Sequence, residues 1–204
     1  MPRVKIPRKS TAIDMTAMCD VAFLLLTFFI LTAKPRVQDP IPVDQPAAAI
    51  IEQLPENDVA VLTVAQKKIF IGVEGVEIRK HLLQEMDTKY KIGFTPEEVN
   101  QFSALSSFGV PIGNLKQFLA LTPDQKKAYV QPGIPIDTTE TSQFYDWVRE
   151  GRKVDASLNT KELTIAIKGD SKEEYPTIAM MIKALQKQKV NKFSLITNVK
   201  AIPK

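Results

Sequence analysis

The most continuous apolar pattern in this chain covers residues 15–33. It reads MTAMCDVAFLLLTFFILTA, nineteen residues with one formal charge, at Asp20. A helix of this length spans ~28 Å, close to the ~30 Å hydrocarbon core of a bilayer. A surface helix of a soluble protein would carry a polar stripe, and between Val21 and Ala33 only two threonines are polar. We therefore predict a transmembrane helix over residues 15–33.

Shorter patterns of strand and helix type follow. VAVLTV and KIFIGV, joined through Ala65-Gln66-Lys67, predict a β-hairpin. The next helical pattern covers residues 77–90 and places Ile78, Leu82 and Met86 on one face. Near the C-terminus, LTIAIK (163–168) and FSLIT (193–197) predict strands on either side of a helix over 176–187. If these strands are parallel, their crossover is right-handed.

A helical insertion is predicted between these two parts, over residues 91–158. TPEE at 95–98 and TPDQ at 122–125 each fit a capping box with proline at the first helical position. Short helices are expected at about 95–107, 113–121, 123–130 and 139–151. We expect its aromatic residues to form a small core of their own, with a partner-binding face as the alternative: Phe102, Phe108, Phe118, Tyr129, Phe144, Tyr145 and Trp147.

The predicted organisation is a membrane-anchored protein of α+β class. Residues 34–58 contain five prolines, which favour an extended linker that could reach ~70 Å. The expected parts are a tail (1–14), the transmembrane helix (15–33), the linker (34–58) and a folded domain (59–204). Cleavage as a signal peptide is disfavoured, because the apolar run is long, carries a charge and places bulky Leu31 before the cleavage site.

The distribution of charge predicts the orientation of the chain in the membrane and disfavours some classes of function. Net charge is +4, and Lys and Arg are spread along the chain, which gives nucleic-acid binding little support. The single cysteine, Cys19, lies in the membrane stretch, so no intramolecular disulfide forms. Basic residues are more numerous before the helix (Arg3, Lys5, Arg8 and Lys9) than after it (Lys34 and Arg36). The positive-inside rule then places the N-terminus in the cytoplasm.

Asp20 is the residue that anchoring alone does not explain. A carboxylate at the centre of a membrane helix costs about 2.5–3.5 kcal/mol, and less nearer an end, whereas leucine would anchor better. Desolvation favours the protonated form of a carboxyl group, so this side chain could gain and lose protons within the membrane. A second explanation stays open from the residues alone: the carboxylate reaches the interface or pairs with a basic residue of a partner helix.

No pattern of an enzyme or a metal site is found in the sequence. It has no P-loop, GxSxG or HExxH motif and no paired cysteines. The only histidine, His81, is expected at the surface, and Asp170 in a loop. We therefore predict no catalytic residues, no metal and no cofactor.

Two stretches of the chain resemble the ExbD/TolR family of proton-motive-force transducers. IDMT (13–16) followed by DVAFLLLTFF (20–29) is similar to the membrane signature of that family. LTIAIKGDSKEEYPTIAMMIKALQKQKVNKFSLIT (163–197) is similar to its C-terminal hallmark of strand, polar loop, helix and strand. The chain departs from the family at Ala17 and Cys19. It also has Asn191 near a common glycine, and asparagine tolerates the left-handed conformation that glycine would supply.

The resemblance implies a single-pass inner-membrane protein with a small periplasmic α+β domain. It implies that Asp20 carries protons and that Thr16, Phe23 and Thr27 pack around it. The implied partners are a second copy, an ExbB/TolQ-like multispanning protein and a TonB/TolA-like transducer that serves outer-membrane transport. Two alternatives stay open: a TolR-like role in envelope integrity with peptidoglycan binding, and a membrane-tethered structural or interaction protein.

Overall fold

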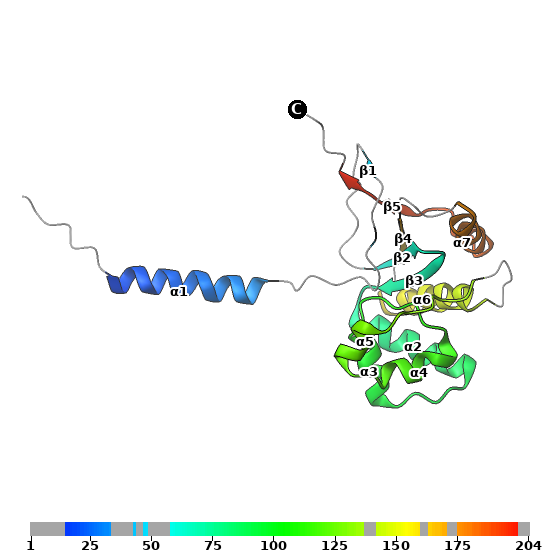
Figure 1. Ribbon diagram of the computed structural model, residues 1–204, viewed down its shortest axis with the longest axis horizontal. Helices are drawn as coiled ribbons and strands as arrows, with labels where there is room; N and C mark the ends of the chain where they lie inside the picture. The colour runs from blue at the N-terminus through cyan, green and yellow to red at the C-terminus, as the bar shows by residue number, and fades with distance from the viewer. Residues whose placement is uncertain are drawn as a thin grey trace, which may run out of the picture. The chain divides into compact units, whose positions relative to one another are not determined.

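The structure is a computed structural model that describes residues 15–33, 43, 47–48, 58–136, 142–159, 163–170 and 175–199. The chain forms two compact units, Met1–Val37 and Gln38–Lys204, which are described separately. Among the described residues, the first unit contains one helix, α1 (Met15–Thr32), and the second contains a sheet with several helices (Figure 1). The predicted α+β class is confirmed. Most of the predicted linker and all of residues 1–14 lie outside the described residues.

The second unit is built on a four-stranded sheet with strand order β3-β2-β4-β5. Its strands are β2 (Val59–Ala65), β3 (Lys68–Val73), β4 (Thr164–Gly169) and β5 (Ser194–Ile196). β2 pairs antiparallel with β3, while β2, β4 and β5 are mutually parallel. A separate pair of short parallel strands joins β1 (Ala47–Ala48) to β6 (Asn198–Val199). The predicted hairpin and both C-terminal strands are therefore confirmed.

The hairpin turn depends on two residues with positive φ. Gln66 (φ 54°) and Lys67 (φ 60°) both take the left-handed conformation between β2 and β3. Two consecutive left-handed residues give the turn type whose twist matches the twist of the strands on either side.

In the described part of the second unit, six helices accompany the sheet. They are α2 (Val76–Tyr90), α3 (Pro96–Ser103), α4 (Ile112–Leu119), α5 (Pro123–Ala128), α6 (Gln143–Asn159) and α7 (Tyr175–Lys187). Both predicted capping boxes are present, at the starts of α3 and α5. The helix expected over 139–151 begins at Gln143 and continues to Asn159, so its predicted end is wrong.

The buried apolar residues form one core that joins the sheet to the predicted insertion. Leu62 of β2 belongs to the same cluster as Phe102, Phe108 and Trp147. The ring centroids of these three aromatic residues lie 4.8 to 5.9 Å apart. Tyr129 is 38% exposed and lies outside the cluster. The expectation that the aromatic residues form a separate small core is therefore wrong.

The predicted insertion also covers the outer edge of β3. Ile71 and Phe108 exchange two backbone hydrogen bonds, of 2.8 and 2.9 Å, and the N–H of Ile134 donates to the carbonyl of Ile69 at 2.9 Å. Unpaired N–H and C=O groups on an edge strand invite pairing with another chain. Along these residues the insertion satisfies them from within the chain.

The end of α7 uses an unexpected residue for its left-handed turn. Lys189 takes φ 59°, whereas Asn191 is not among the described residues with positive φ. The N–H of Val190 donates to the carbonyl of Leu185 at 3.1 Å, which closes the end of the helix. The expectation of a left-handed residue at the asparagine is therefore wrong, and a lysine takes that conformation two positions earlier.

Candidate functional site

The helix α1 contains a single ionisable acid in apolar surroundings. It is long and apolar enough to cross a membrane, and none of its residues is buried. Within Met15–Ala33 there is no Lys, Arg or His, so Asp20 has no basic partner on its own helix. The charge of this carboxylate must be removed by protonation, or balanced by water or by a group from another chain.

The polar side chains of α1 are arranged around Asp20. Helical spacing at i−4, i+3 and i+7 places Thr16, Phe23 and Thr27 on the same face as Asp20. The Thr27 hydroxyl donates to the carbonyl of Leu24 at 2.9 Å, which satisfies it within the helix. This face therefore carries one carboxyl group, beside a satisfied hydroxyl and an aromatic ring.

The folded domain treats a buried carboxylate differently. Asp146 on α6 is only 2% exposed. The Tyr90 hydroxyl donates to its Oδ2 at 2.7 Å, Lys89 bonds its Oδ1, and Arg149 Nη2 lies 3.5 Å from the same oxygen. Burial, together with the hydrogen bond to Asp146, raises the pKa of Tyr90, so this phenol keeps its proton. The cluster joins the end of α2 to the start of α6.

Glu150 lies one helical turn further along α6, and basic side chains also balance its charge. Arg149 Nη2 lies 2.7 Å from its Oε1, and Lys153 Nζ lies 3.0 Å from its Oε2. Burial by itself raises the pKa of Glu150, but the hydrogen bonds from Lys153 and Arg149 outweigh it and hold this pKa below its ordinary value. Asp146 and Glu150 therefore both have charged partners.

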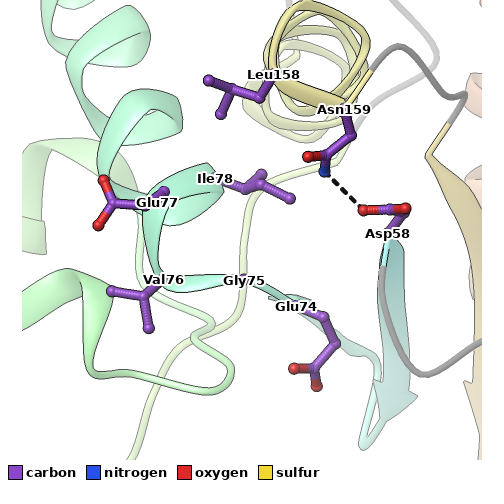
Figure 2. Close-up of a pocket in the computed structure, with 8 residues that line it drawn as sticks. All are labelled: Asp58, Glu74, Gly75, Val76, Glu77, Ile78, Leu158 and Asn159. Atoms are coloured by element: carbon purple, nitrogen blue, oxygen red, sulfur yellow. Dashed lines mark hydrogen bonds between the residues drawn. The ribbon is translucent and has the colours of Figure 1, made fainter.

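The surface of the domain has a hollow with acidic walls, of about 620 Å³. Asp58, Glu74 and Glu77 line it together with aliphatic residues from α2 and α6 (Figure 2). The Asn159 amide donates to Asp58 Oδ1 at 2.7 Å. A hydrogen bond from Lys80, at 2.9 Å, lowers the pKa of Glu77. Glu77 thus remains charged at neutral pH.

A second hollow, of about 680 Å³, has the opposite charge. Arg152, Lys189 and Lys192 line it, together with residues at the starts of β4 and β5. Sequence reasoning missed both hollows, because their residues come from distant segments with no shared local motif. Only the topology of the sheet brings them together.

The described residues contain no cluster suited to metal binding. Among them, no group of three or more His, Cys, Asp or Glu side chains is placed to hold a metal ion. His81 is exposed on α2, as predicted.

The comparisons with known proteins agree with the membrane helix and the fold. Residues 7–199 match the family described as biopolymer transport protein ExbD/TolR. The comparison with curated proteins and the comparison with solved structures each gave no significant match. Members of the matched family are inner-membrane, single-pass proteins that act in transport complexes.

Proposed function

Because the chain belongs to the ExbD/TolR family, we propose that it is the single-pass subunit of an ExbB–ExbD-type proton channel. In this role Asp20 binds and releases protons, while Thr16, Phe23 and Thr27 pack around it. The complex couples proton flow to TonB-dependent transport across the outer membrane. The chain itself is not an enzyme and needs no cofactor.

The observation that carries this proposal is the isolated carboxylate in α1. The helix has Asp20 and no basic residue, although a carboxylate at this depth weakens membrane insertion. A protein that needed only an anchor would gain stability from an apolar residue there. Proton exchange explains why the acid is present and why it has no permanent partner on its helix.

The available energy suits a mechanical role. One charge that crosses 100 mV releases about 2.3 kcal/mol, so a few protons can drive a conformational step. In the proposed arrangement residues 1–14 lie in the cytoplasm, residues 34–58 form a periplasmic linker and residues 59–204 form the periplasmic domain. Two copies pair within an ExbB/TolQ-like ring, and the domain passes the work to a TonB/TolA-like protein.

The proposal is tested by replacing the carboxylate without changing its size. Asp20→Asn should leave membrane insertion and protein level unchanged but abolish energy-dependent uptake in the cell. Asp20→Glu should retain part of the activity, because it keeps a titratable group at that position. Full uptake by the Asp20→Asn strain would refute the proposal.

The same strain separates the two branches of the family. Loss of uptake assigns the chain to the ExbD branch. Leakage of periplasmic proteins with unchanged uptake would instead assign it to the TolR branch, which acts in envelope integrity. Cosedimentation of the full-length chain with peptidoglycan would support the second result.

A further inference from the structure

We propose that the hydroxyl group of Thr27 holds the water through which protons reach Asp20 from the C-terminal end of α1. This inference rests on the proposed function, in which Asp20 binds and releases protons. It gives Thr27 a role beyond packing, as a residue that positions water on the route to the acid.

Asp20 lies closer to one end of α1 than to the other. At a rise of ~1.5 Å per residue, it is about 8 Å from Met15 at the start of the helix and about 18 Å from Thr32 at its end. In the proposed arrangement the longer segment is on the periplasmic side, from which a potential that is negative inside the cell drives protons. Protons therefore need a route along the longer segment to reach the acid.

Thr27 is the polar side chain that lies on this route. Between Val21 and Ala33 the polar side chains are those of Thr27 and Thr32. At ~100° per residue, Thr27 lies about 20° from Asp20 around the helix axis, whereas Thr32 lies about 120° away. Thr27 thus stands on the same face as the acid and divides the longer segment into parts of about 10 Å and about 8 Å.

The helix face between Asp20 and Thr27 is apolar. Phe23 and Leu24 lie on it, one turn beyond the acid. A passage with only apolar walls loses its water, and hydrophobic constrictions close channels in this way. A hydroxyl group at the far end of this stretch gives a file of about three waters, spaced ~2.8 Å apart, a fixed polar contact opposite the carboxyl group.

The hydrogen bond that Thr27 makes is compatible with this role. Its hydroxyl donates to the carbonyl of Leu24 at 2.9 Å. A hydroxyl group has one hydrogen to donate and two lone pairs that accept, so the same oxygen can accept a hydrogen bond from water. The bond to the backbone therefore fixes the position of Thr27 Oγ1 and leaves its acceptor sites for water.

Protons pass along this file without changing Thr27. The water beside Asp20 gives a proton to the carboxylate, so one O–H bond of the water breaks and one O–H bond of the acid forms. That water takes a proton from the next water in the file, and this exchange continues to the periplasmic side. Release of the proton on the other side of Asp20 restores the carboxylate. Thr27 keeps its own hydrogen throughout, so it positions water and is not itself a carrier.

Replacing the hydroxyl group of Thr27 with a methyl group tests the inference. The full-length chain is purified with its multispanning partner and placed in liposomes, where an imposed potential drives protons that a pH-sensitive dye detects. Thr27→Val keeps the branched shape of threonine and should lower proton conduction about tenfold, because the water file loses a hydrogen-bonding contact. Thr27→Ser keeps the hydroxyl group and should retain most of the conduction.

A second threonine of α1 provides the matched control. The Thr32 hydroxyl donates to the carbonyl of Phe28 at 2.8 Å, the same kind of bond that Thr27 makes. Thr32→Val is therefore the same chemical change on another face of the helix. It should leave conduction unchanged. A loss equal to that of Thr27→Val would show an effect on the helix as a whole and would overturn the inference.

A second measurement separates the delivery of protons from their binding. Infrared spectra of the same complexes, taken as differences from the Asp20→Asn complex, report the carbonyl band of the protonated acid. Thr27→Val should leave the extent of Asp20 protonation at equilibrium unchanged, but slow its approach to equilibrium after a jump in pH. An unchanged rate would overturn the inference, because a side chain that only packs against the acid does not control the delivery of protons.

The outcomes separate this inference from the function on which it rests. Full conduction by the Asp20→Asn complex would overturn the proposed function and this inference with it. Loss of conduction in Asp20→Asn, together with full conduction in Thr27→Val or no recovery in Thr27→Ser, would overturn the role of Thr27 alone. We expect Thr27→Val to co-purify with the multispanning partner as the parent does, and its failure to do so would show a packing role and also overturn the inference.

Discussion

The membrane helix and the folded domain treat acidic side chains in opposite ways. In the domain, Asp146 is 2% exposed and bonds Lys89 and Tyr90, while Glu150 bonds two basic residues. In α1, Asp20 lies in an apolar stretch with no basic residue. Basic partners favour the charged form of Glu150, whereas Asp20 has no such partner on its own helix. We propose that this difference distinguishes acids that maintain the structure from one that carries protons.

The largest effect is expected where pairing is broken in the domain. Asp146→Ala leaves Lys89 without its carboxylate and the Tyr90 hydroxyl without its acceptor. We expect the free energy of unfolding to fall by about 3 kcal/mol, because removing one partner of a buried pair leaves the other uncompensated. Urea unfolding, followed by circular dichroism, measures the change.

Glu85→Ala serves as the matched control on the exposed face of α2. This change should stay within about 0.5 kcal/mol of the parent protein, as surface substitutions usually do. Equal stabilities for the Asp146 and Glu85 variants would show that the ion cluster does not hold α2 to α6.

In the membrane helix, removing the acid should be stabilising, because it should favour membrane insertion. Asp20→Leu should favour membrane insertion by about 2–3 kcal/mol, because it replaces a carboxylate with an apolar side chain. A glycosylation-based insertion assay of residues 1–58 compares the two sequences. Unchanged or weaker insertion would mean that the carboxylate does not lie within the hydrocarbon region.

A smaller, pH-dependent effect is expected from Glu150. Its pKa is lowered in the folded state, so its stabilising contribution is present above the unfolded-state pKa of about 4.3 and is lost as the pH falls below that value. Glu150→Gln should therefore cost about 1 kcal/mol at pH 6 and less at pH 3.5. Urea unfolding of both proteins at the two pH values checks this, and an equal difference at both would contradict it.

Most elements could be predicted because their signals are local. β-rich runs predicted β2 and β3, and the capping boxes at Thr95 and Thr122 predicted the starts of α3 and α5. The end of α6 has no such signal. The helix was expected to stop at Gly151, but Val154 and Asp155 beyond it are buried, so tertiary packing carries the helix on to Asn159.

In the candidate site, too, local features could be predicted from the sequence and contacts between distant residues could not. Asp20 could be found from the sequence, because one charge in an apolar run is visible without a fold. The partners of Asp146 could not be found, since Tyr90 lies 56 positions away and Lys89 lies 57 positions away. The two charged hollows likewise depend on the parallel order of β2, β4 and β5, which single-residue patterns do not specify.

Proton conduction through the reconstituted complex tests the central claim most directly. The full-length chain is purified with its multispanning partner, placed in liposomes and subjected to an imposed potential, while a pH-sensitive dye reports proton entry. We predict conduction with Asp20 present, and conduction equal to that of empty liposomes after Asp20→Asn. Undiminished conduction in the Asp20→Asn complex would contradict the account.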